Sequence, residues 1–253
     1  MAHALGYLVA PVSDRRGNGC QRAFAAGRRP ALPAGLLGLF LVLVAATPSE
    51  AQPALQTVRF AVFSSKPITD IAFAPRPNAA PQPVAFYPTA RSPRYEYRGP
   101  MPVRFIDPTS KAVIAEATIP PEIHDALLLF SPAPGGGGSP LKFQISVLDD
   151  SAVRHGAGGL AVINLSGLVL TGTVNNTAVT LKPGLNPTLP VGRSAKIVFH
   201  TMLKNRSYQA YADTVPLAAK ERALLILFPP FYQGSLEVQS RLLVDVPPTA
   251  PLR

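Results

Sequence analysis

Short runs of alternating hydrophobic and polar residues, separated by Pro, Gly and Asn, cover the chain from residue 52 onward. No segment in this region carries a sustained hydrophobic stripe at helical spacing. Proline makes up 25 of its 202 residues, and each proline inside a helix costs about 3 kcal/mol. The pattern therefore predicts an all-β fold of short strands joined by proline-rich loops.

The clearest predicted hairpin is Leu168–Leu181 (LVLTGTVNNTAVTL). A two-residue turn at Asn175–Asn176 is expected, because asparagine tolerates positive φ better than most residues. In that register one face is hydrophobic and the other carries threonine: Leu170, Val174, Val179 and Leu181 against Thr171, Thr173 and Thr180. A second hairpin is expected around Lys204–Asn205.

Three stretches of the chain recur about 95 to 102 residues further on. The matched pairs are Ala126–Pro132 (ALLLFSP) with Ala223–Pro230 (ALLILFPP), Leu141–Asp149 with Leu236–Asp245, and Val58–Ser64 with Leu160–Ser166. Self-similarity at a fixed spacing indicates an internal duplication. Chance similarity between hydrophobic strands is the competing interpretation.

Each copy divides into about seven short strands, which is the size of an immunoglobulin-like sandwich. The expected strands are 55–63, 70–74, 83–87, 101–107, 112–118, 125–131 and 142–149, then 159–165, 168–174, 177–181, 195–203, 206–213, 222–228 and 236–244. We therefore predict two tandem immunoglobulin-like β-sandwich domains at 52–150 and 159–247, with a linker at 151–158 and a tail at 248–253. One sandwich of about fourteen strands is the alternative.

Residues 1–51 have the features of a secretory signal peptide. Five arginines precede the uncharged run Ala31–Ala46, and small residues follow at Ser49–Ala51. A basic region, a short hydrophobic region and a small-residue exit together predict export and cleavage. Because a spanning helix needs roughly 20 apolar residues, an uncleaved anchor is the weaker alternative, and membrane contact is expected only through this segment before cleavage.

Removing the leader changes the composition. The whole chain has 24 basic and 14 acidic side chains, of which five and two precede residue 52, so the remainder carries a net charge of +7. The single cysteine, Cys20, lies in the leader. An exported protein without disulfides must gain its stability from burial alone, and about 200 residues are enough for that.

Several segments resemble a loose group of secreted or periplasmic β-sandwich proteins of environmental Gram-negative bacteria. They are Arg91–Pro100 (RSPRYEYRGP), Ala126–Pro132, Asp149–Ser151 (DDS), Ile163–Gly167 (INLSG) and Gly184. The resemblance implies a fold and a periplasmic, extracellular or cell-surface location. It implies no catalytic residue.

A search for catalytic and metal-binding patterns finds little. No G-x-S-x-G motif is present, and the histidines after the leader (His124, His155 and His200) lack the spacing of a zinc site. Asp149 and Asp150 are the only adjacent carboxylates after the leader, so they are the candidate ligands for a calcium ion. A strand end that caps its own turn is the simpler interpretation. No cofactor is expected.

The candidate ligand-binding surface is the stretch 91–104 (RSPRYEYRGPMPVR). Its arginines and tyrosines alternate, with Glu96 as the only acid: Arg91, Arg94, Tyr95, Tyr97, Arg98 and Arg104. Arginine binds carboxylate, sulfate and phosphate groups in a bidentate manner, and tyrosine adds flat contact area. An envelope protein or an anionic polysaccharide is the expected partner, and nucleic acid is not. A solvated strand edge is the competing interpretation.

Together these observations predict an exported, non-catalytic structural or interaction module of the cell envelope. A carbohydrate-binding or anionic-glycan-binding accessory protein is the first alternative, although the chain has no tryptophan to stack on sugar rings. A hydrolase is the second alternative, and it requires a cleft with clustered acids or a histidine beside a nucleophile.

Overall fold

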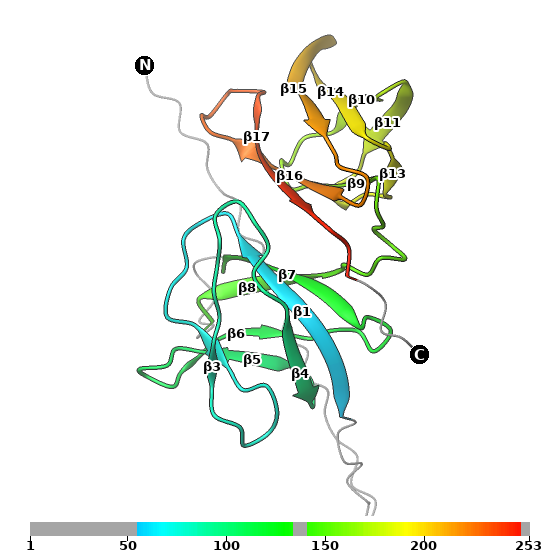
Figure 1. The fold of residues 1–253 in the computed structure, drawn as a ribbon. Coiled ribbons are helices and arrows are strands. Elements are labelled where there is room, and N and C mark those ends of the chain that lie inside the picture. The colour runs from blue at the N-terminus through cyan, green and yellow to red at the C-terminus, as the bar shows by residue number, and fades with distance from the viewer. Residues whose placement is uncertain (1–54, 134–140, 249–253) are drawn as a thin grey trace, which may run out of the picture. The chain divides into compact units, whose positions relative to one another are not determined.

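The fold is all-β, with no helix among the residues that the computed structural model describes, which are 55–133 and 141–248 (Figure 1). The predicted leader, the tetraglycine segment Gly135–Gly138 and most of the predicted tail lie outside these residues. Within 55–133 and 141–248 no helix is long and apolar enough to cross a membrane. The described residues belong to one compact unit.

The strands fall into two successive groups. The first half of the fold comprises β1 (Gln56–Ser64), β2 (Ala72–Phe73), β3 (Gln82–Pro83), β4 (Tyr95–Gly99), β5 (Val103–Ile106), β6 (Val113–Ala117), β7 (Asp125–Pro132) and β8 (Phe143–Asp149). The second half comprises β9 (Gly159–Asn164), β10 (Leu170–Val174), β11 (Thr177–Leu181), β12 (Gly184–Leu185), β13 (Leu189–Pro190), β14 (Ser194–Leu203), β15 (Arg206–Pro216), β16 (Arg222–Pro230) and β17 (Val238–Asp245).

Each half has an inner and an outer sheet, and the two halves repeat one topology. The inner sheets have the orders β4-β1-β7-β8 and β12-β9-β16-β17, and the outer sheets have the orders β3-β2-β5-β6 and β11-β10-β14-β15. In both inner sheets the two central strands are parallel, β1 with β7 and β9 with β16. The three pairs of segments matched in the sequence therefore occupy the same positions in the sheet order.

Four sheets enclose three hydrophobic cores. One core lies between the two sheets of the first half, and a second lies between the two sheets of the second half. The third joins the two inner sheets, and its buried members are Ala61, Phe63, Leu127, Leu129, Ala161, Ile163, Leu224, Ile226 and Leu243. The inner sheets are thus covered on both faces, which stacks the two sandwiches against one another.

The hydrophobic pattern explains this stacking. A strand that faces solvent on one side alternates, whereas a strand buried on both sides is a continuous hydrophobic run. The runs in β7 (ALLLF) and β16 (ALLILF) are continuous, and all their residues are buried except Phe228, which is half-buried. In β16, Leu225 and Leu227 point into the core of the second half, while Leu224 and Ile226 contact the first half.

The predicted hairpins are confirmed. Leu170 pairs with Leu181 and Val174 with Thr177, around a turn in which Asn175 has a φ of +52°. The second turn lies at Lys204 and Asn205, both of which have positive φ.

The sequence reading missed three strands. Strand β4 lies in the arginine–tyrosine stretch, where Tyr95, Tyr97 and Gly99 are buried and Glu96 and Arg98 are exposed. It pairs with β1 as an edge strand. This alternation is a regular strand pattern, but its charged positions resemble a solvated loop. Strands β12 and β13 have two residues each, which is too short for periodicity to detect. The immunoglobulin-like assignment of each half and the domain boundaries stay predictions.

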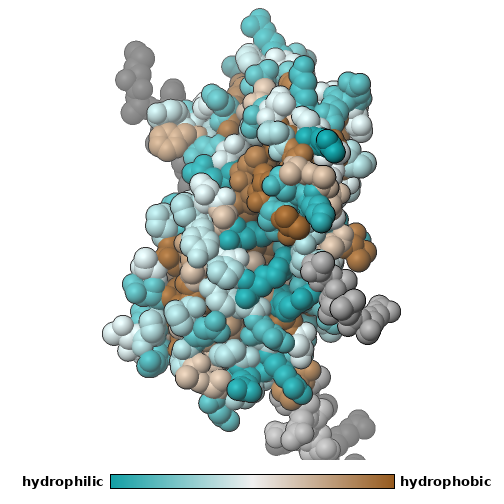
Figure 2. All heavy atoms as spheres, in the orientation of Figure 1, coloured by the Kyte–Doolittle hydropathy of each residue, from teal (hydrophilic) through white to brown (hydrophobic). Residues whose placement is uncertain are grey.

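Hydrophobic residues are not spread evenly over the surface. On the face drawn in Figure 2 the largest hydrophobic area lies over β16 and β17, while hydrophilic residues predominate over the first half. Val244 and Val246 are exposed hydrophobic residues at the end of β17 and just after it.

We predict that Ile226→Ala lowers the free energy of unfolding by about 2–5 kcal/mol, because it leaves a cavity in the core between the inner sheets. Urea unfolding of the variant measures this loss. The control is Val244→Ala on the neighbouring strand, where an exposed side chain is removed and a change within about 0.5 kcal/mol is expected. Equal, small effects of both substitutions would contradict the packing of the inner sheets.

Candidate functional site

The two tyrosines of the predicted binding stretch are core residues. Tyr95 and Tyr97 are each 7 % exposed. The Tyr95 hydroxyl accepts a hydrogen bond from the Ala85 amide at 2.8 Å, and the Tyr97 hydroxyl donates to the Pro100 carbonyl at 2.6 Å. The Tyr95 ring also packs 5.6 Å from the ring of Phe60, measured between centroids. Tyr95 is therefore enclosed by the core, while Tyr97 also lines a pocket of about 300 Å³ together with Arg76 and Arg104.

The four arginines of the stretch divide into two pairs. Arg98 and Arg104 are exposed, and Arg104 forms an ion pair with Glu116 at 3.1 Å. Arg91 and Arg94 instead point toward Asp150, and the Arg91 side chain is 5 % exposed. The predicted residues therefore do not form one surface. Anion binding by this stretch stays a prediction.

A buried network of charges joins the two halves, and Arg222 is at its centre. This side chain is 0 % exposed at the start of β16. Its Nε donates to Asp245 Oδ1 at 2.8 Å, and its Nη2 donates to Asp150 Oδ2 at 2.9 Å and to Asp245 Oδ2 at 3.1 Å. Its Nη1 donates to the carbonyls of Asp150 and His155, both at 2.9 Å. One guanidinium thus binds the end of β8, the end of β17 and the loop between the halves.

Asp150 receives two further arginines. Arg94 Nη2 donates to its Oδ2 at 3.1 Å and Arg91 Nη2 to its Oδ1 at 3.3 Å. Arg91 Nη1 also donates to Asp245 Oδ1 at 2.9 Å. Arg91 therefore links the carboxylates of Asp150 and Asp245, as Arg222 does. Burial is the main cause that lowers the pKa of Arg91, and Asp150 and Asp245 oppose it.

This arrangement disfavours the predicted calcium site. Three guanidinium groups already surround Asp150, and their charge repels a cation. Asp149 points elsewhere: its Oδ1 accepts from the Ser151 amide at 3.0 Å, which is the turn-capping role weighed against metal binding. Among the described residues no group of three His, Cys, Asp or Glu side chains is placed to hold a metal ion.

His155 is the titratable residue at the edge of this network. Its Nε2 lies 2.8 Å from the Ala223 carbonyl, and its Nδ1 lies 4.0 Å from Asp150. Burial, and then the positive charges of Arg222 and Arg91, lower the pKa of His155 from 6.5 to about 4. The imidazole is therefore neutral at pH 7 and donates from Nε2 to the carbonyl.

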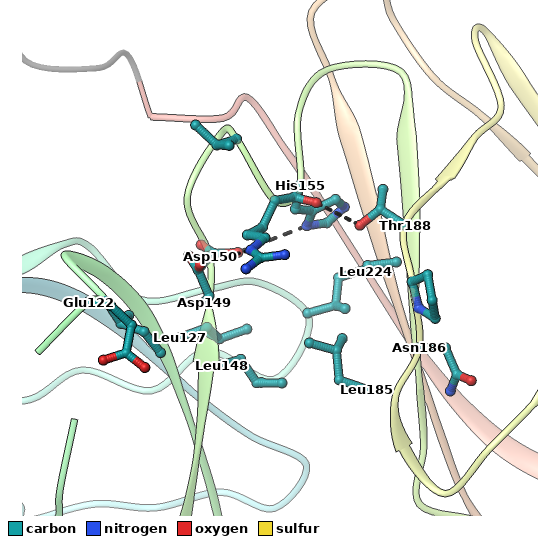
Figure 3. Close-up of a pocket in the computed structure, with 15 residues that line it drawn as sticks. Glu122, Leu127, Leu148, Asp149, Asp150, His155, Leu185, Asn186, Thr188 and Leu224 are labelled. Atoms are coloured by element: carbon teal, nitrogen blue, oxygen red, sulfur yellow. Dashed lines mark hydrogen bonds and ion pairs between the residues drawn. The ribbon is translucent and has the colours of Figure 1, made fainter. Parts of the chain in front are cut away.

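A pocket of about 590 Å³ opens beside His155, between strands of both halves (Figure 3). Leu127 and Leu148 line it from the first half, and Leu185 and Leu224 line it from the second half. Its polar rim includes Glu122, Asp149, Arg154, Asn186 and Thr188. This volume lies within the range of small-molecule sites, and hydrophobic walls with a few polar groups are typical of them.

The polar side chains on the second-half wall of the pocket have structural partners. Asn186 Oδ1 accepts from the Lys182 amide at 2.8 Å, and Nδ2 donates to the Lys182 carbonyl at 2.9 Å. Thr188 donates to the Arg154 carbonyl at 2.8 Å. Thr188 is the one hydroxyl or thiol residue among those that line the pocket, and its hydroxyl bonds to a backbone carbonyl and not to a histidine or carboxylate side chain. The geometry suits non-covalent binding, and it lacks a nucleophile beside a base.

Comparison with known proteins adds no assignment. No protein-family model matches the chain, and no curated protein matches it.

Sequence reasoning did not single out Arg222, which begins a hydrophobic strand. A signal was present, because the repeat aligns Arg222 with Asp125, so the two copies carry opposite charges before the same hydrophobic run. In the structure Asp125 pairs with Arg59 at 2.8 Å, and Arg222 pairs with Asp150 and Asp245.

We predict that His155 makes stability depend on pH between about 4 and 6.5. In that window the unfolded chain binds a proton that the folded chain does not, so stability falls as the pH decreases. A pKa lowered from 6.5 to about 4 corresponds to about 3 kcal/mol of stability, present above pH 6.5 and lost by pH 4. Urea unfolding at several pH values measures this.

In His155→Gln, which keeps a donor for the Ala223 carbonyl, this component of the pH dependence should be absent. The control is His124→Gln, which changes an exposed histidine whose backbone carbonyl accepts from the Arg59 amide. This variant should keep the pH dependence of the wild type. Identical pH profiles for wild type and His155→Gln would contradict the assignment.

Proposed function

We propose that this protein is an exported, non-catalytic interaction module of the cell envelope. Its two stacked sandwiches act as a rigid frame, and its loops and the pocket between the halves act as contact surfaces. The buried charge network is the observation that carries the proposal.

The network uses the groups that catalysis would need. Asp150 and Asp245 bind arginines, and His155 is neutral and bonded to a carbonyl. A general acid or base has to reach a substrate proton and needs a pKa near the operating pH. His155 is buried, and its pKa of about 4 lies far below neutrality. These groups therefore act in holding the two halves together.

Export is supported by the leader, and the way the rest of the chain gains stability is compatible with it. The chain after residue 51 has no cysteine, so its folding does not depend on an oxidising compartment. Three hydrophobic cores and a satisfied buried guanidinium stabilise it instead. A protein of this kind can fold after translocation without an oxidant.

We predict that the full chain, expressed in a Gram-negative host, reaches the periplasm and begins at Gln52. Cell fractionation and intact-mass measurement check this. Leu41→Arg interrupts the hydrophobic run of the leader, so that variant should stay in the cytoplasm at full length. Wild type retained in the cytoplasm would contradict export, and periplasmic protein that still begins at Met1 would contradict cleavage of the leader.

The same purified protein tests the absence of catalysis. It should hydrolyse ester, glycoside and phosphate chromogenic substrates no faster than buffer does. Asp149→Asn provides the comparison, because Asp149 lines the pocket and its main structural role is a turn cap. Turnover by wild type that is lost in the folded Asp149→Asn variant would assign a hydrolytic function instead.

A further inference from the structure

Exposed hydrophobic side chains concentrate at one end of the second half. We call this end the distal loops: 165–169 between β9 and β10, 182–183 between β11 and β12, the β14–β15 hairpin tip with its flanks at 202–208, and 231–237 between β16 and β17. Seven of the thirteen large hydrophobic residues exposed in the described chain belong to them: Leu165, Val169, Met202, Leu203, Tyr208, Phe231 and Tyr232. The remaining six are spread over the rest of the described surface.

Strand register places these loops at the same end. The Leu165 amide, just after β9, donates to the Leu227 carbonyl near the end of β16 at 2.8 Å. Thr171 near the start of β10 pairs with His200, three residues before the end of β14. Leu181 at the end of β11 pairs with Leu170 at the start of β10. The ends of β9, β11, β14 and β16 and the start of β10 therefore present their loops together.

The loops hold their hydrophobic side chains outward on a fixed backbone. The hairpin tip is a two-residue turn closed by the pairing of Leu203 with Arg206. In the last loop the rings of Phe231 and Tyr232 pack edge to face, with centroids 4.8 Å apart, and each residue is 72 % exposed. The Ser235 amide closes this loop on the Tyr232 carbonyl at 3.1 Å. The backbone conformation of these loops therefore keeps their hydrophobic side chains exposed.

The equivalent end of the first half provides an internal comparison. Two of its described loops, 65–71 and 107–112, contain no exposed large hydrophobic residue, and the described loop 84–94 between β3 and β4 contains one, Tyr87. The first two loops carry charges of both signs instead, including Lys66, Asp70, Asp107 and Lys111. Since the two halves share one topology, the fold itself does not require hydrophobic loops at this end. The exposed hydrophobic residues in the loops of the second half are therefore a feature of that half and not of the shared topology.

The charges of the distal loops identify the partner. They include three cations, Lys182, Lys204 and Arg206, and one acid, Glu237. Protruding hydrophobic tips flanked by cations match a lipid surface, in which an apolar interior lies below anionic headgroups. Tyrosine suits this boundary, because its ring is apolar and its hydroxyl stays hydrated. A flat protein partner would favour a continuous face over separate tips.

We infer that the distal loops dock the protein on the surface of an anionic phospholipid bilayer. Phe231, Tyr232, Met202 and Leu203 enter the headgroup region, and Lys204 and Arg206 contact phosphates. This inference rests on the proposed envelope function and gives it a partner. It also revises the expectation that the membrane is contacted only through the leader.

Co-sedimentation with lipid vesicles tests the inference. The exported chain should sediment with vesicles of phosphatidylglycerol and phosphatidylethanolamine at about 0.1 M salt, and only weakly at about 0.5 M salt or with phosphatidylcholine alone. The pair Lys204→Gln/Arg206→Gln should weaken binding about 30-fold, since each cation near an anionic surface contributes about a factor of five.

Two further pairs of substitutions separate the hydrophobic contribution to vesicle binding from any effect on folding. Phe231→Ser/Tyr232→Ser and Met202→Ser/Leu203→Ser change exposed side chains on different loops, so thermal unfolding should be unchanged while binding falls about tenfold or more. The control pair Lys66→Gln/Lys111→Gln removes the same charge from the matching loops of the first half. It should bind like the wild type.

Folded wild type that does not sediment with anionic vesicles at low salt would overturn the inference. So would self-association in solution that Phe231→Ser/Tyr232→Ser abolishes without any vesicle binding, because the loops would then join two copies. The fractionation experiment keeps the two proposals separate. An exported chain that does not bind vesicles contradicts this inference alone, and a chain retained in the cytoplasm contradicts the proposed function.

Discussion

The buried guanidinium of Arg222 is the contact on which the arrangement of the two halves depends. A buried charge is costly unless every donor is satisfied, and here each nitrogen has a partner within 3.1 Å. Burial by itself lowers the pKa of Arg222, but the hydrogen bonds that it donates to Asp245 and the negative charge of Asp150 raise this pKa overall. Removing this side chain would leave two carboxylates with fewer partners in a poorly hydrated place. The network therefore favours one arrangement of the halves over other packings of the same hydrophobic faces.

The duplicated topology shows how such a network arises. Asp125 and Arg222 occupy equivalent positions at the start of β7 and β16, yet their charges are opposite. Two identical copies would place like charges at the two strand starts. With the charges exchanged, Asp125 binds Arg59 within its own half, and Arg222 reaches across to Asp150. The hydrophobic core between the inner sheets stabilises their contact but does not favour one orientation of the sheets over another. The ion pairs have a fixed geometry, and they therefore set the orientation.

The sequence predicted the local structure well and the long-range structure poorly. Hairpin turns are set by neighbouring residues, so the register around Asn175 could be derived from alternation alone. The continuous run in β16 was recognised as a strand, but its burial on two faces depends on a second sheet about 100 residues away. Strand β4 was hidden because its inward tyrosines and outward charges resemble a binding loop. The same pattern made Tyr95 and Tyr97 candidates for ligand contact, although both rings pack in the first core. Arg222 was not singled out because its partners, Asp150 and Asp245, lie far from it in the sequence.

Because the chain has no tryptophan, coupling between the halves can be measured with one reporter in each. Phe86→Trp and Tyr211→Trp place single tryptophans at half-buried positions beside the first and second cores. Urea unfolding followed by tryptophan fluorescence, with circular dichroism of the same samples as the reference, should give coincident transitions for both reporters. In the Arg222→Met background the two midpoints should separate. Separate midpoints with Arg222 intact would contradict the account.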